Sequence, residues 1–243
     1  MPAASAETAA PDQRRSDFSA GFVATLPLWI GVAPFGAVYA VSALAAGLTS
    51  AQTLAMSLFV FAGASQFTAA GLFAAGVAPI TIVVTTLIVN ARHLLLAASL
   101  APFVRRERAW KRALLAFQLT DESYAVGMRR WLSGTGSAAY QFGTNTSLYV
   151  IWQASTVAGI LLGGLIPDTS ASGLDLVFPL TFIGMLVPLL RDRVSGMVAV
   201  LAGILAIGAL LLLPGSWYLL IAGIGASGVG AWATRGRPDK VTG

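Results

Sequence analysis

One apolar stretch of the sequence carries charge at a depth where a bilayer would exclude water. It runs from Val83 to Pro102 (VVTTLIVNARHLLLAASLAP) and contains Asn90, Arg92 and His93. A guanidinium group near the middle of the hydrocarbon layer costs a few kcal/mol, so it normally faces a protein interior or a wet cavity. On a helix, Asn90 and His93 lie one turn apart on one face, while Arg92 points elsewhere. The three side chains can therefore border one cavity.

The composition identifies an integral membrane protein. Of the 243 residues, 56% are hydrophobic and only 10% are charged, and the mean hydropathy is +0.78. Several apolar runs exceed the roughly 18 residues that a helix needs to cross a bilayer, and they do not alternate as barrel strands do. We predict an all-α, polytopic transmembrane helix bundle of about seven crossings with one short or re-entrant segment, compatible with inverted repeats.

The charge pattern and the cysteine count exclude several kinds of protein. The net charge is +5, but the basic residues cluster at the ends of apolar runs, as topology signals do, so no nucleic-acid partner is expected. No cysteine is present, which excludes disulfides and thiolate chemistry, and the single histidine argues against a metal site. We expect no cofactor. Residues 1–17 are interpreted as a disordered tail, 18–234 as one transmembrane domain and 235–243 as a C-terminal tail.

The first apolar segment, 18–48, is too long for one straight helix. It contains Pro27 and Pro34 within an otherwise apolar run, so a kinked or interrupted span is expected. The backbone around Pro34, Phe35 and Gly36 either borders a cavity or forms a proline kink beside a closely packed glycine. The sequence leaves both interpretations open.

A second segment, 49–75, contains the run FAGASQF from Phe61 to Phe67. Ser65 and Gln66 bring hydrogen-bonding groups to membrane depth, where they need partners. Either they form a polar clamp between helices or they contact a substrate.

The segment 113–131 is short for a span and is interrupted by Asp121 and Glu122. Basic residues lie at both of its ends, in RRERAWKR (105–112) and at Arg129 and Arg130. This favours a segment that does not fully cross, and it places RRERAWKR in a cytoplasmic loop. Four crossings are expected after Arg130, at 140–165, 174–190, 194–213 and 217–232. If three full spans preceded Arg105, the N-terminus would be external, unless one segment enters the membrane and returns.

The motifs resemble those of the AzlC family of branched-chain amino acid exporters. The resemblance covers about 18–127 and rests on Pro34-Phe35-Gly36, on Phe61 to Phe67, on Asn90-Ala-Arg-His93 with Leu94, Ser99 and Leu100, and on Thr120-Asp121-Glu122. It implies the large subunit of a two-component permease in the bacterial cytoplasmic (inner) membrane, with a small hydrophobic AzlD-type subunit as partner. It also implies export of valine, leucine, isoleucine and in some members methionine, or uptake in others, driven by the proton gradient.

The chemistry of a zwitterionic, apolar amino acid suggests a role for each motif. Such a substrate needs a cation or free N–H groups, an acidic or carbonyl acceptor and an apolar pocket. We assign Arg92 to the carboxylate, with Asn90 and Gln66 as hydrogen-bonding neighbours, and Asp121 or Glu122 to the ammonium group or a transported proton. The apolar wall is assigned to Phe35, Phe61 and Phe67. The candidates for substrate binding or proton coupling are Pro34, Phe35, Gly36, Ser65, Gln66, Asn90, Arg92, His93, Asp121 and Glu122.

Four other interpretations compete with this assignment. Arg92 and an acid of the 121–122 pair can form an ion pair that only holds helices together. The chain can also be a channel, or a structural subunit whose partner carries the substrate site. An intramembrane enzyme is disfavoured because no nucleophile elbow, second aspartate motif or metal-ligand set accompanies Ser65, His93 or Asp121.

Overall fold

The computed structural model describes residues 11–163, 183, 187, 190, 192–212 and 217–234. The elements in this part of the chain are helical, which confirms the all-α prediction. The chain divides into two compact units, Met1–Asp175 and Leu176–Gly243. In the described ranges, four helical segments are long and apolar enough to cross a membrane: Asp12–Ala45, Pro79–Val104, Ala138–Gly163 and Arg193–Leu212.

Several boundaries expected from the sequence fall outside the described residues. Residues 1–10 and 235–243 lie entirely outside the described part of the chain. Only three positions of the expected span 174–190 lie within it. Residues 11–17, which the composition assigns to a tail, belong to the first helix.

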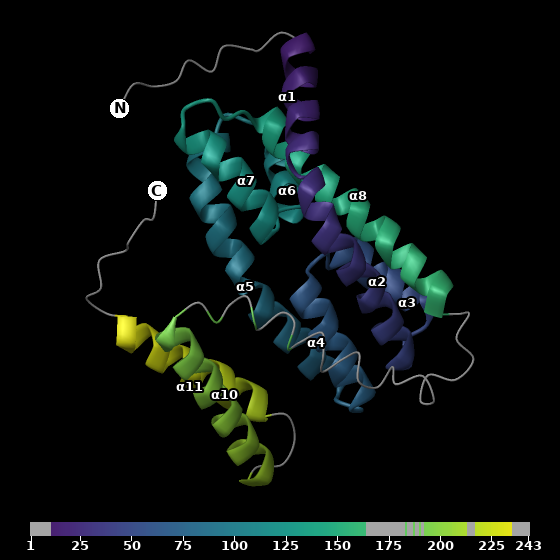
Figure 1. Cartoon of the computed structure of the whole chain (residues 1–243), viewed down its shortest axis with the longest axis vertical. Coiled ribbons are helices and arrows are strands. Elements are labelled where there is room, and N and C mark those ends of the chain that lie inside the picture. Colours follow the sequence, from purple (N-terminus) through teal and green to yellow (C-terminus); the bar gives the residue numbers. More distant parts are fainter. Residues whose placement is uncertain are drawn as a thin grey trace. The chain divides into compact units, whose positions relative to one another are not determined.

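Two long helical segments of the first unit run side by side in the same direction. The first comprises α1 (Pro11–Ala24), the short 3-10 helix η1 (Leu26–Leu28) and α2 (Trp29–Ala45), and the second is α8 (Ala138–Gly163) (Figure 1). The expected interruption therefore lies at Pro27, whereas α2 continues through Pro34.

Glycines make the contact between these two segments close. A Cβ atom at Gly143 would lie 2.0 Å from the carbonyl oxygen of Phe18, and one at Gly159 would lie 2.4 Å from that of Ala37. Small residues let helix backbones approach in this way inside a membrane. The α1–α2 segment and α8 thus form the central pair of the unit.

The segment expected to be a second span is instead a hairpin of two short helices, α3 (Ser50–Phe59) and α4 (Gly63–Ala74), which we call hairpin A. Ser57 of α3 lies beside Thr156 of α8, while Phe73 near the end of α4 lies beside Gly47, just before α3. Both ends of hairpin A therefore lie at the end of the unit where α2 stops.

Hairpin B consists of α6 (Ala109–Phe117) and α7 (Asp121–Leu132), which follow α5 (Pro79–Val104). α7 runs along α5 in the same direction, because Ser99 bonds to Tyr124 and Phe103 contacts Trp131. Its last residues therefore return to the end of α5, next to the start of α6. This geometry agrees with the expectation that 113–131 does not fully cross.

The two hairpins enter the unit from opposite ends. Their helices have 9 to 12 residues, so each is about 14–18 Å long, roughly half of a 30 Å hydrocarbon layer. The order of elements α2, α3, α4, α5 is repeated with inverted direction by α5, α6, α7, α8. Three equivalent pairs pack together in both sets: α2–α3 and α5–α6, α2–α4 and α5–α7, and α4–α5 and α7–α8. Short or interrupted apolar segments in corresponding positions of two halves are a feature of inverted-repeat transporters.

Charge is concentrated at one end of the first unit. The hydrogen bond from Ser137 to Asp17, 2.6 Å, and the stacking of Arg130 on Tyr140 bring the starts of α1 and α8 to the end of α7. This end carries Arg14, Arg15, Arg105, Arg106, Arg108, Lys111, Arg112, Arg129 and Arg130. The connections at the opposite end, 46–49 and 75–78, contain no charged residue. The positive-inside rule therefore predicts that the basic end is cytoplasmic, together with the start of α1.

The second unit contains an antiparallel pair, α10 (Arg193–Leu212) and α11 (Trp217–Thr234). A Cβ atom at Gly225 would approach Leu205, and one at Gly230 would approach Val198, both at 2.9 Å. The order of these contacts shows that α11 returns along α10.

Candidate functional site

The tips of the two hairpins meet at Tyr149 of α8. Its ring lies 4.8 Å from that of Phe61 in the tip of hairpin A and 6.3 Å from that of Phe117 at the tip of hairpin B. Its hydroxyl donates a hydrogen bond of 3.1 Å to the carbonyl oxygen of Leu58 at the end of α3. One side chain therefore contacts both interruptions in the middle of the unit.

Polar side chains of α8 also satisfy carbonyl groups where the hairpin helices end. Gln153 Nε2 donates to Ser57 O at 3.0 Å, and Asn145 Nδ2 donates to Leu115 O at 3.0 Å. The last carbonyls of a helix have no intrahelical partner, and leaving them unpaired away from water is costly. These bonds stabilise α3 and α6 as half-length helices.

Two polar residues of α5 connect the first turns of α4 and α7. Asn90 Oδ1 accepts a hydrogen bond from Ser65 Oγ of α4. Arg92 Nη1 lies 2.8 Å from Asp121 Oδ2 at the start of α7. The stretch from Asn90 to Arg92 therefore joins both hairpins just beyond their tips.

The Arg92–Asp121 ion pair remains accessible. The side chains are 47% and 46% exposed, although Arg92 lies near the middle of α5, which is long and apolar enough to span. A charged pair at this depth is stable where water or other polar groups reach it, and not in contact with lipid tails. At the depth of a membrane span, these two side chains therefore need water or polar groups around them.

The two helix N-termini at the site differ in charge. α7 begins with a capping box between Thr120 and Ser123, and its first turn carries Asp121 and Glu122. α4 begins after Ala62, with no side-chain hydrogen bond from that cap residue, and its first turn contains no acid. A helix N-terminus carries a partial positive charge. At the start of α7 this charge is balanced by Asp121 and Glu122, whereas the start of α4 has no acid and favours binding of an anion.

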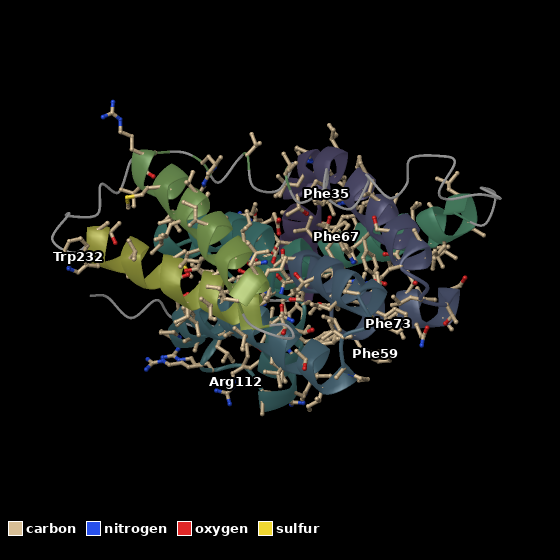
Figure 2. The ribbon with its side chains drawn as sticks, turned by 90° about the horizontal axis from the view of Figure 1, so that it is seen from below. Phe35, Phe59, Phe67, Phe73, Arg112 and Trp232 are labelled. Atoms are coloured by element: carbon tan, nitrogen blue, oxygen red, sulfur yellow. The ribbon has the colours of Figure 1, made fainter. Side chains whose placement is uncertain are left out.

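The structure separates the remaining expected site residues. Phe35 lies in edge-to-face contact with Phe67, 6.2 Å between ring centres (Figure 2). Gly36 is buried against Ser155 of α8, where a Cβ atom would clash, and Pro34 is exposed. Gln66 is fully buried and accepts a hydrogen bond from the backbone of Ala62. His93 is half-buried and Glu122 is exposed.

Sequence reasoning did not assign a role to α8. Its polar residues recur at spacings of three and four, which places them on one face of the helix. They are Gln141, Thr144, Asn145, Tyr149, Gln153 and Thr156. A polar stripe on an otherwise apolar span indicates that this face contacts polar groups of other segments. This pattern could have predicted the contacts between α8 and the ends of the short helices.

Opposed hairpins of short helices, within a bundle of helices long and apolar enough to cross a membrane, define a polytopic membrane protein. The chain belongs to the AzlC family, whose model, described as "AzlC protein", matches residues 27–166.

Three relatives cover most of this chain. The "Branched-chain amino acid transport protein AzlC" of Bacillus subtilis is 24% identical over 87% of this chain and 83% of its own length. The "Inner membrane protein YgaZ" of Escherichia coli is 29% identical over 82% of this chain and 84% of its own. An "Uncharacterized membrane protein" of Helicobacter pylori strain J99 is 26% identical over 84% of this chain and 90% of its own length. No solved structure matches the chain significantly.

Proposed function

We propose that this chain is the large subunit of a secondary transporter that exports valine, leucine and isoleucine, and in some cases methionine, coupled to the proton gradient. The substrate site lies where the hairpin tips meet. The observation that carries this proposal is the position of Asn90 and Arg92, which contact the first turns of α4 and α7 from one helix. The printed name of the Bacillus subtilis relative supports the substrate class.

A free amino acid matches the Arg92–Asp121 pair in charge. Its carboxylate can replace Asp121 as the partner of Arg92, while its ammonium group replaces Arg92 as the partner of Asp121. Neither protein charge is then left unpaired, which would otherwise cost several kcal/mol at low dielectric. The zwitterion thus enters by exchanging one ion pair for two.

Neighbouring groups complete this site. The first turn of α4, with Ser65, and Asn90 of α5 assist in binding the carboxylate, because a helix N-terminus attracts negative charge. Gln66 is a hydrogen-bonding neighbour on α4, and the rings of Phe35, Phe61 and Phe67 supply the apolar wall. Glu122 and His93 are the candidates for carrying the coupled proton.

A purely structural ion pair is the alternative, and three variants distinguish it. They are Arg92→Gln, Asp121→Asn and the double variant, tested by efflux of labelled valine from cells, with folding checked by size-exclusion chromatography. If the pair binds substrate, all three lose export, while the double variant folds because no single charge is left unpaired. If the pair is structural, the double variant recovers export that the single variants lose. Glu107→Gln with Lys111→Gln removes the surface ion pair at 3.4 Å and serves as control.

The same assay tests the partner and the transport mechanism. We expect export to require co-expression of a small hydrophobic membrane subunit of the AzlD type. Export should saturate with valine concentration and show counterflow, as a carrier does. Flux that follows the gradient without exchange would identify a channel instead.

A further inference from the structure

A groove at the basic end of the first unit joins an apolar surface to a cation. It lies between the last turns of α5 and α6 and has a volume of about 310 Å³, within the range of roughly 300–1,000 Å³ usual for ligand sites. Eight lining residues are apolar and one is charged: Ala97, Leu100, Ala101, Val104, Ala109, Arg112, Ala113, Leu115 and Ala116. Five of the apolar residues are alanines, and Leu100, Val104 and Leu115 are buried, so no large apolar side chain covers this surface.

One cation lines the groove, and others lie in the adjoining connection. Arg112 lines it and points away from the ribbons (Figure 2). Arg105 follows Val104 directly in the chain, and Arg108 directly precedes Ala109, so the connection between α5 and α6 adds further positive charge at the same end. Glu107 is the acid in this connection, and it pairs with Lys111.

The start of α6, with Trp110 and Lys111, has the composition of a membrane interface, and the apolar residues of its outer face continue toward the tip of hairpin B. Trp110, Leu114 and Phe117 follow at spacings of four and three and are 60%, 38% and 44% exposed. Lys111 Nζ lies over the Trp110 ring at 5.8 Å. Tryptophan and basic residues are enriched where the hydrocarbon layer meets the head groups. The groove therefore opens at the level of phosphate groups.

We propose that this groove binds an anionic phospholipid, with one acyl chain along the alanine-lined surface and the head-group phosphate on Arg112. The two parts of such a lipid match the two parts of the groove: hydrocarbon between the helices, and negative charge beside the cations. The proposal does not depend on transport or on the nature of the substrate.

Native mass spectrometry of the detergent-purified full chain tests it with three probes: phosphatidylglycerol, phosphatidylcholine and inorganic phosphate. We expect phosphatidylglycerol to bind more tightly than phosphatidylcholine and phosphate alone not to compete. Arg112→Gln should weaken phosphatidylglycerol binding about fivefold, the effect of one arginine near an anionic surface. The matched control Arg129→Gln removes an exposed arginine at the same end outside the groove, and should change it by less than about twofold.

A second pair of variants tests the acyl-chain part. Ala113→Phe places a ring in the groove and should also weaken binding, while Ala125→Phe enlarges an exposed alanine of α7 that does not line the groove. Equal binding of the two lipids, competition by phosphate alone, or equal losses in Arg112→Gln and Arg129→Gln would each overturn the proposal. So would unchanged binding in Ala113→Phe.

Discussion

The hydroxyl of Tyr149 donates a hydrogen bond to the carbonyl oxygen of Leu58, 3.1 Å away, while its ring contacts Phe61 and Phe117. Tyr149 therefore joins α8 to the tips of two hairpins that enter from opposite ends. This one side chain donates a hydrogen bond to a carbonyl group near the end of α3 and packs against two aromatic rings.

Tyr149→Phe should lower the thermal midpoint of the purified protein by about 2–4 °C, the shift expected for roughly 1 kcal/mol in a chain of this size. The substitution keeps the ring contacts and leaves the Leu58 carbonyl without its donor. Tyr149→Ala should lower the midpoint further, because the ring contacts are lost as well. Tyr140→Phe, which retains the ring under Arg130, is the control. Equal effects of Tyr149→Phe and Tyr140→Phe would contradict the role given to the Leu58 bond.

Gly159→Ala should destabilise the contact between α2 and α8 by about 1–3 kcal/mol. The new Cβ atom would lie 2.4 Å from the Ala37 carbonyl oxygen, and backbone cannot move aside as a flexible side chain can. Gly31→Ala is the matched control, because nothing lies within 4 Å of a Cβ atom there and alanine is the better helix former. Thermal unfolding of both variants should show a lower midpoint for Gly159→Ala only.

Single-cysteine reporters should place both ends of each hairpin on one side of the membrane. The natural chain has no cysteine, so Ser50→Cys, Ala78→Cys, Arg106→Cys and Ser133→Cys can each be labelled alone. We expect a membrane-impermeant maleimide to label positions 50 and 78 in intact cells, and positions 106 and 133 only after permeabilisation. Labelling of 50 and 78 from opposite sides would show that 50–74 crosses the membrane.

Asn90→Asp should reduce leucine efflux at least about tenfold without unfolding the protein. A carboxylate next to Ser65 would occupy the positive start of α4 and repel the substrate carboxylate, while the same helix end stabilises the new charge. Ser65→Ala removes only the hydrogen bond to Asn90 and should have a smaller effect. Export at the normal rate in folded Asn90→Asp protein would remove Asn90 from the substrate site.

The candidate site could be predicted in part from the sequence. Polar residues at membrane depth need partners, and this argument correctly selected Ser65, Asn90, Arg92 and Asp121 as residues that interact. It could not pair Ser65 with Asn90, because the residues that meet across helices depend on helix direction. The sequence left open whether Arg92 pairs with Asp121 or with Glu122, and the structure shows the pair with Asp121.

The break in hairpin A could not be predicted. Phe61 adopts a positive φ of 42°, a conformation that favours glycine, and the run FAGASQF lacks a charge or proline that would indicate a turn. Hairpin B was partly predicted because Asp121 and Glu122 interrupt its apolar pattern. The stabilising partners of both breaks lie on α8, far away in the sequence.

The sequence by itself determined that this protein folds in a membrane, that it is helical, where its basic clusters lie along the chain, and which residues need polar partners. These follow from local hydrophobicity and charge, which are properties of each segment alone. Only the tertiary structure decided that two segments turn back halfway and that their tips meet at Tyr149. A half-length helix leaves carbonyl groups unpaired, and it is stable in an apolar surrounding only where another helix supplies the donors.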